Sequence, residues 1–143
     1  MFSADGTEPL SDDELLYRRI PVSQGWYTEG VLSPEAYGPH RERDVDGISF
    51  WRAKCRCLDE AARGRPGKDY YVAVIRVGDL RERGIEPVST PHKGGGGHVS
   101  LPALNAENRR SPEAQALKAR LCELTLKVEG PFHTFSAEET KQG

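Results

Sequence analysis

Apolar residues are concentrated in residues 70–77, where β-branched and aromatic side chains occupy both sets of alternating positions. A strand that is apolar on both sides is typical of the interior of a sheet covered on two faces. Gly78 interrupts the run, Asp79 is a suitable helix N-cap, and Gly84 suits the left-handed position after a short helix. The pattern therefore predicts a central strand that leads through a turn into one turn of helix.

Four shorter segments have the alternation or the composition of strands: residues 15–20, 48–55, 98–101 and 125–129. In the first of them, alternation places Arg18 on one face of the strand and Arg19 on the opposite face. We expect Pro21 to end this strand and Gly130-Pro131 to end the last one.

A serine followed by proline and glutamate marks two helix starts, at residues 33–35 and 111–113. The second start leads into Leu117, Leu121 and Leu124, whose spacing forms an apolar stripe on a helix over residues 111–124. A shorter helix is predicted over residues 58–63.

The predicted elements together indicate an α+β fold. We expect a single compact domain with a small mixed or antiparallel sheet, a few short helices and one longer C-terminal helix. Its expected limits are a disordered N-terminal segment over residues 1–10, the domain over residues 11–132 and a flexible tail over residues 133–143.

The composition narrows the class of partner. With 143 residues, 36% of them hydrophobic, the chain can bury one modest core, and its net charge of −2 argues against a broad nucleic-acid or membrane footprint. No apolar run approaches the roughly 18 residues of a membrane span. The acidic N-terminus lacks the basic and apolar regions of a signal peptide, so we expect a cytoplasmic protein.

The potential metal ligands follow no known pattern. There are three cysteines, an odd number, and the spacing of Cys55, Cys57 and Cys122 matches no zinc site, so we expect three structural thiols and no metal. Asp44 and Asp46 lie in a segment that resembles the start of a calcium loop, but the remaining ligand positions are missing.

A glycine-rich loop, residues 94–97, follows Lys93. One interpretation is a flexible surface loop, because ordering four glycines in a row costs much backbone entropy. The other is a loop that closes over an anion through its backbone N–H groups, with Lys93 beside them. The order of residues differs from that of a P-loop, in which lysine comes after the glycines.

No complete catalytic signature is present, and this favours a binding function. Trp26, Tyr27 and Trp51 lie in or near predicted loops and are candidates for an interface with another protein. The first hypothesis is thus a small bacterial binding or accessory module that uses no cofactor. Ordinary core packing is the alternative interpretation of the tryptophans.

The order of the predicted strands and helices along the chain is similar to that of a known fold. A strand with arginines (LYRRI) is followed by a strand with a small polar residue (ISFWRA), the strand YYVAVIRVGDLRERGI and a strand after the glycines (GGGGHVSLP). Over residues 15–104 this resembles the smaller proteins of the ADP-ribosyltransferase fold, including the RNA 2′-phosphotransferase branch. The chain is also similar to small stand-alone bacterial proteins that share the segments at residues 16–19 and 44–47, a resemblance that brings no known activity.

The transferase resemblance implies a split sheet that binds nicotinamide adenine dinucleotide (NAD). Arg18 or Arg19 would hold the pyrophosphate or a ribose, and Ser49 would contact the nicotinamide ribose. His98 would act near the scissile bond and is the catalytic candidate. Arg18, Arg19, Ser49 and His98 would then line one cleft, with Lys93 and the rest of the loop over residues 92–98 at its mouth.

This chain departs from the family at one position. Many transferases of the fold carry a catalytic glutamate on the strand that corresponds here to HVSLPAL, which has none; Glu107 comes later, in a predicted loop. The resemblance therefore implies binding with weak turnover or none.

A third hypothesis is a nucleic-acid-associated accessory protein. It is supported by a series of basic residues over several elements: Arg41, Arg43, Arg52, Lys54, Arg56, Arg63, Arg65 and Lys68. A solvated basic surface is the alternative interpretation of the same residues.

Overall fold

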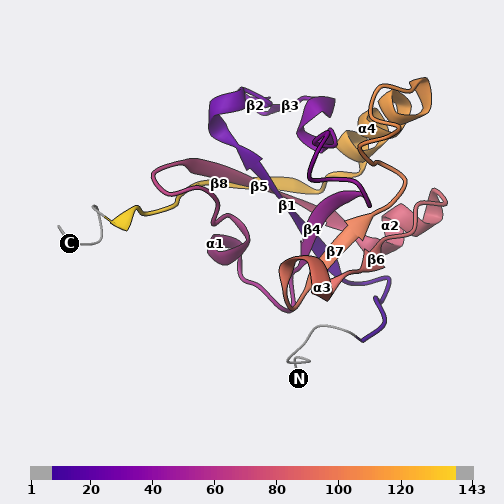
Figure 1. The fold of residues 1–143 in the computed structure, drawn as a ribbon, viewed down its shortest axis with the longest axis horizontal. Coiled ribbons are helices and arrows are strands. Elements are labelled where there is room, and N and C mark those ends of the chain that lie inside the picture. Colours follow the sequence, from indigo (N-terminus) through magenta and orange to yellow (C-terminus); the bar gives the residue numbers. More distant parts are fainter. Residues whose placement is uncertain (1–7, 138–143) are drawn as a thin grey trace.

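A six-stranded antiparallel sheet forms the centre of the computed structural model, which describes residues 8–137 (Figure 1). Its strands run in the order β6-β7-β4-β1-β5-β8, and a separate hairpin pairs β2 with β3. The bounds are β1 Leu15–Pro21, β2 Tyr27–Thr28, β3 Val31–Leu32, β4 Ile48–Arg52, β5 Asp69–Arg76, β6 Val88–Ser89, β7 His98–Leu101 and β8 Lys127–His133.

The helices are short except for the last. They are η1 Val22–Gln24, η2 Pro34–Tyr37, α1 Leu58–Ala61, α2 Val77–Glu82, α3 Pro91–Gly94 and α4 Pro112–Leu124. The predicted α+β fold with one longer helix towards the C-terminus is confirmed. Both predicted serine caps are present: Ser33 accepts a hydrogen bond from the backbone N–H of Glu35, and Ser111 accepts one from that of Ala114.

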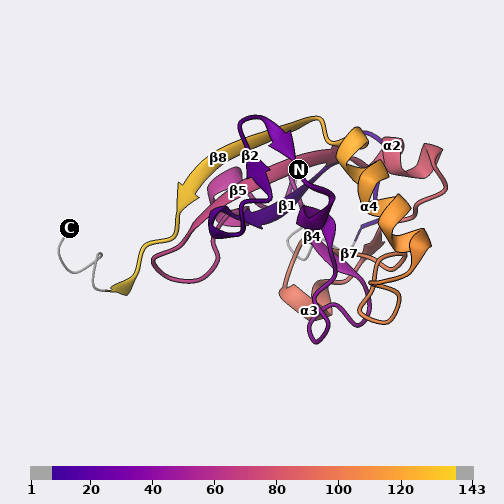
Figure 2. The ribbon, with the colours of Figure 1, turned by 90° about the horizontal axis from the view of Figure 1, so that it is seen from above.

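β5 is the interior strand that the apolar run predicts. It pairs with β1 on one side and with β8 on the other, and Val72, Ala73, Val74 and Ile75 are fully buried. Figure 2 shows β8 following β5 along the sheet.

The predicted start of the next helix was wrong. α2 begins at Val77, directly after the strand, so Asp79 lies inside its first turn instead of capping it. The backbone N–H groups of Val77 and Gly78 bond to the carbonyl oxygens of Glu14 and Asp12, so no side-chain cap is needed for them. Gly84 does take the predicted left-handed conformation, with φ 75°.

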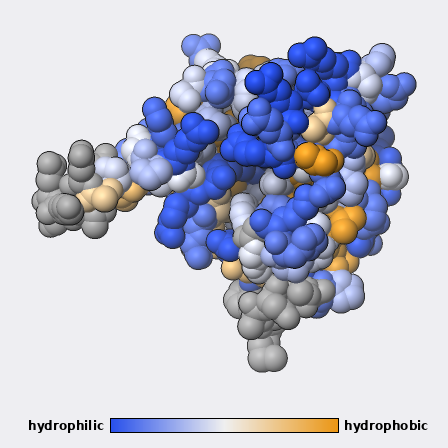
Figure 3. Space-filling model, viewed as in Figure 1, coloured by the Kyte–Doolittle hydropathy of each residue, from blue (hydrophilic) through white to orange (hydrophobic). Residues whose placement is uncertain are grey.

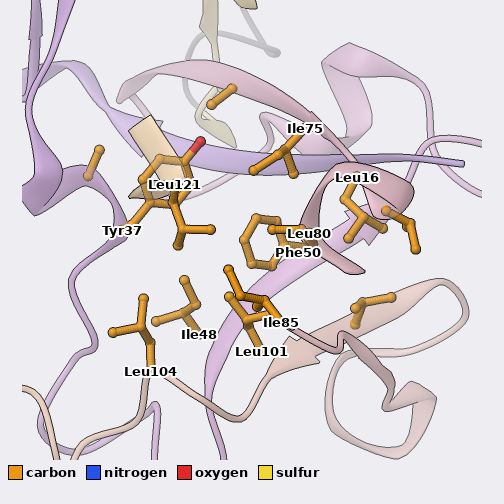
Figure 4. Close-up of a cluster of buried hydrophobic side chains, with 14 of the residues drawn as sticks. Leu16, Tyr37, Ile48, Phe50, Ile75, Leu80, Ile85, Leu101, Leu104 and Leu121 are labelled. Carbon is orange, nitrogen blue, oxygen red and sulfur yellow. The ribbon is translucent and has the colours of Figure 1, made fainter. Parts of the chain in front are cut away.

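Alternation along each strand gives the sheet two distinct faces. The side covered by α2 and α4, here called the core face, carries the main apolar cluster shown in Figure 4, including Leu16, Phe50, Ile75 and Leu101. The opposite side, here called the α1 face, carries a smaller cluster in which Ala62, Tyr70 and Val72 are buried. Most of the apolar area is therefore buried on one side of the sheet, and polar side chains have room on the other.

Two segment ends differ from their predictions. β4 ends at Arg52 instead of residue 55, because the chain turns there and the N–H of Cys55 bonds to the carbonyl of Arg52. β8 continues through the cis Gly130-Pro131 bond to His133, because it pairs with β5 as far as Asp69. Thr134, just beyond the strand, is buried.

The predicted terminal segments lie partly outside the described residues: only 8–10 of the N-terminal segment and 133–137 of the tail fall within them. Leu10 is buried, and the carbonyl of Glu8 accepts a hydrogen bond from Arg52. Within residues 8–137, no helix has the length and apolar character that crossing a membrane requires.

Candidate functional site

Three neighbouring strands bring four of the predicted site residues onto the α1 face: Arg19, Ser49, Trp51 and His98. β4 lies between β7 and β1, and the register pairs Trp51 with His98 on one side and with Tyr17 on the other. Ser49 and Arg19 lie two residues from Trp51 and Tyr17, so they share that face. Strands separated in the sequence thus place Arg19, Ser49 and His98 on one surface.

His98 is the centre of a chain of hydrogen bonds. Its Nε2 lies 3.0 Å from the hydroxyl of Ser49, and its Nδ1 lies 2.8 Å from the hydroxyl of Thr90. The Thr90 hydroxyl in turn lies 2.9 Å from that of Ser100. His98, Thr90 and Ser100 are buried, whereas Ser49 is half-buried and forms the accessible end of the chain.

The imidazole of His98 is held neutral. Burial lowers its pKa from the ordinary value and the positive charge of Lys93 adds to this, while a backbone hydrogen bond with Thr90 and the charge of Asp44 oppose the shift. A neutral imidazole donates through one nitrogen and accepts through the other, which suits a chain with a hydroxyl at each end.

The lowered pKa of His98 predicts an acid-sensitive fold. In the unfolded chain histidine titrates near 6.5, so below that pH the unfolded state binds the extra proton. The contribution of His98 to stability is therefore complete above about pH 6.5 and is lost as the pH falls through its folded-state pKa. An NMR titration of the His98 ring protons checks this; a midpoint at or above 6.5 would contradict it.

Arg18 and Arg19 have separate roles, and the expectation that both line one cleft with His98 was wrong. Arg18 extends on the core face, where it donates to the carbonyl oxygens of Ala36 and Ser49, each at 3.1 Å. Arg19 lies on the α1 face, donates to the carbonyl of Arg63 and lies over the ring of Tyr70 at 5.5 Å. Adjacent residues of a strand point to opposite faces, so only Arg19 is available to a ligand beside Ser49.

Trp51 links the histidine to a second arginine. Its ring meets that of His98 edge-on, with centroids 4.9 Å apart, and the guanidinium of Arg56 lies 4.4 Å from its centroid. Trp51 is half-buried. The α1 face therefore combines an aromatic ring, a neutral imidazole, a hydroxyl and the two guanidinium groups of Arg19 and Arg56.

The glycine loop borders this surface. Its first residues are helical, because α3 covers Pro91–Gly94, so the predicted loop over residues 92–98 is shorter than expected. Gly97 has φ 87°, and a Cβ there would lie 2.5 Å from Cβ of Cys55, so only glycine fits. A Cβ on Gly95 would lie 3.4 Å from the guanidinium of Arg56. Lys93 forms an ion pair with Asp46, so a ligand would have to compete with a carboxylate for it.

Two of the aromatic interface candidates are used for packing. Trp26 is partly buried against the main core cluster. Tyr27 meets Tyr71 edge-on at 4.9 Å.

The cysteines are poor nucleophiles at neutral pH. Burial raises the pKa of the thiols of Cys55 and Cys122, and the carboxylates of Asp59 and Glu60 raise that of Cys57. Among residues 8–137, no cluster of three or more histidine, cysteine or carboxylate side chains is arranged to hold a metal ion.

Sequence reasoning missed Thr90, Ser100 and Arg56 as parts of the site. Ser100 could have been found, since it lies two residues from His98 on a predicted strand and so shares its face. Thr90 and Arg56 come from the segments before α3 and α1, whose positions depend on tertiary packing.

The chain of hydrogen bonds lacks the third member of a nucleophilic triad. The partner of His98 Nδ1 is a hydroxyl rather than a carboxylate, so the ring lacks the anionic partner that stabilises the imidazolium in a triad. Glu107 is exposed in the turn beyond β7. Comparisons with protein-family models, with curated proteins and with solved structures found no match for this chain.

Proposed function

We propose that the protein binds a dinucleotide of the NAD type on the α1 face, over Arg19, Ser49, Trp51 and His98. The observation that carries the proposal is the 3.0 Å contact between His98 and Ser49, which joins the strands β7 and β4. These are two of the strands to which the transferase resemblance assigns ligand contacts, and β1, the arginine strand, lies next to β4.

Each group suits one part of such a ligand. The Ser49 hydroxyl and the neutral imidazole can donate to or accept from ribose hydroxyls. The planar guanidinium groups of Arg19 and Arg56 can each donate two parallel hydrogen bonds to a pyrophosphate. The ring of Trp51 offers a surface for a base, and Arg56, which now lies over that ring, would move to the phosphates.

The proposal is one of binding with weak turnover or none. Cleavage at the nicotinamide ribose passes through a positively charged centre, which a carboxylate would stabilise. β7 supplies His98 and Ser100 to this face, and neither is acidic. We therefore assign His98 to ligand binding. The cytoplasmic location expected from the sequence stays a prediction.

The two other hypotheses are less well supported. Trp26 and Tyr27 pack within the molecule, and the face in Figure 3 is predominantly hydrophilic, which does not favour a protein-binding module. Of the basic series, Arg52 is fully buried and Lys54 pairs with Glu8, so these residues do not form one surface for nucleic acid.

Calorimetric titration with NAD and ADP-ribose tests the proposal. Arg19→Gln should weaken binding about tenfold or more, because one lost charge-assisted hydrogen bond is worth about 1.5–3 kcal/mol. Ser49→Ala should also weaken it. Arg83→Gln, which removes an exposed arginine after α2, is the matched control and should leave affinity unchanged.

Arg18→Ala separates this proposal from the alternative in which both arginines hold the ligand. It should lower stability by about 2–4 kcal/mol, since two backbone carbonyls lose a charged donor. Any loss of binding should follow the loss of folded protein. Absence of binding of NAD and ADP-ribose at millimolar concentration, with the protein folded, would refute the proposed function.

A further inference from the structure

A basic pocket lies between η2 and the first turns of α4, away from the α1 face. It has a volume of about 230 Å³ and is lined by Glu35, Gly38, Pro39, Arg109, Arg110, Gln115 and Lys118. Three of these residues are cationic and one is anionic, so the lining carries an excess of two positive charges.

Lys118 is the unusual member of this set. Its side chain is only 4% exposed, and burying an ammonium group is costly unless its donors are satisfied. The carboxylate of Glu35 accepts one hydrogen bond from Nζ at 2.9 Å. An ammonium has three donors, and within residues 8–137 the structure records no acceptor for the other two.

The two arginines reach the pocket from the segment before α4. Arg109 is held in place, since its Nη1 donates to the carbonyl of Ala106 at 2.7 Å and its own carbonyl accepts a bond from Gln115. This leaves the rest of its guanidinium fork for a ligand. Arg110 is exposed and can close over the opening.

We propose that this pocket is a second binding site, for the dianionic phosphate of a phosphate monoester. The phosphate would neutralise the excess of two charges, would accept the spare donors of Lys118 and would receive the fork of Arg109. A carboxylate or a phosphodiester carries a single negative charge and would leave one cation uncompensated. The site is independent of the proposed dinucleotide site, because its residues come from other elements.

Titration with inorganic phosphate and with methyl phosphate, followed by amide NMR at constant ionic strength, tests this assignment. We expect saturable one-to-one binding with shifts confined to Gly38, Gln115 and their neighbours. Dimethyl phosphate, a diester of similar size, should bind at least about fivefold more weakly because it carries half the charge.

Single substitutions distinguish a specific phosphate site in this pocket from non-specific electrostatic attraction of phosphate to the protein. Arg110→Gln and Lys118→Met should each weaken phosphate binding about tenfold or more, since each removes a charged donor. Arg120→Gln, which removes an exposed cation from the same helix, is the control and should have no effect. If Lys118→Met does not fold, the phosphate affinities of Arg110→Gln and Arg109→Gln are compared with that of the wild type instead.

Three results would overturn the proposal. They are non-saturating shifts spread over the surface, equal weakening by Arg120→Gln, and tighter binding of the diester. Tight binding of an RNA oligonucleotide in competition with phosphate would assign the pocket to nucleic acid instead. None of these results depends on NAD binding, which Arg110→Gln should leave unchanged.

Discussion

Replacing Glu14 by alanine is expected to destabilise the protein by about 3–5 kcal/mol, the usual cost of breaking a buried ion pair by removing one partner. Arg52, at the end of β4, is fully buried on the core face, and Glu14 is nearly so. Their contact is bidentate: Nε and Nη2 of the arginine each lie 2.7 Å from a carboxylate oxygen. Removal of Glu14 would leave the buried guanidinium with only the longer contact to Glu8, whose Oε1 lies 3.4 Å from Nη2.

The pair also fixes the segment before β1. Arg52 Nη1 donates to the carbonyl of Glu8 at 2.8 Å, and Glu14 accepts a bond from the N–H of Ser11 at the same distance. The backbone carbonyl of Glu14 in turn accepts the first N–H of α2, from Val77. Loss of the carboxylate should therefore loosen the N-terminal segment and the start of α2 together.

Urea unfolding followed by circular dichroism measures this effect. Glu42→Ala is the matched control, because Glu42 is exposed, and it should change the free energy of unfolding by less than about 0.5 kcal/mol. The double variant Glu14→Leu/Arg52→Met should recover much of the loss, since an apolar pair can replace a buried ion pair. A loss below about 1 kcal/mol in Glu14→Ala would show that the arginine finds water or another partner.

Five of the six strands of the sheet could be predicted because each follows a local pattern, whereas β6, with only two residues, was missed. The apolar run over residues 70–77 and the leucine stripe of α4 are periodic, and both elements formed close to their predicted limits. The same alternation puts Arg52 on the face of Ile48 and Phe50. It could not show that this arginine is buried, because its partner lies 38 residues earlier in the chain.

The site was predicted only in part, because contacts between residues far apart in the sequence do not follow from local pattern. Ser49 and His98 were both predicted from the transferase resemblance, and the register between β4 and β7 is what brings their side chains into contact. The separation of Arg18 from Arg19 followed from alternation alone, whereas the expectation of one shared cleft overlooked it. The helical turn of α3 escaped prediction because glycines disfavour helix, and the segment is fixed by contacts with its neighbours.

Replacing Val74 by aspartate is expected to abolish folding. Val74 lies in the interior strand and is fully buried, so the new carboxylate would enter an apolar site without a partner. Lys127, its cross-strand neighbour, is exposed and already paired with Glu129, so it offers no buried counter-charge. The cost of several kcal/mol is comparable to the whole stability of a domain, about 5–15 kcal/mol.

Two further substitutions identify the cause of the loss. Val74→Ala deletes the same side chain without adding charge and should remain folded, with a loss of about 1–3 kcal/mol from the cavity. Val31→Asp places the same charge at a position that is 70% exposed and should have little effect. Soluble expression and a cooperative thermal transition are the measurements. A soluble Val74→Asp protein that melts cooperatively would show that position 74 reaches water, and this would remove β5 from the interior of the sheet.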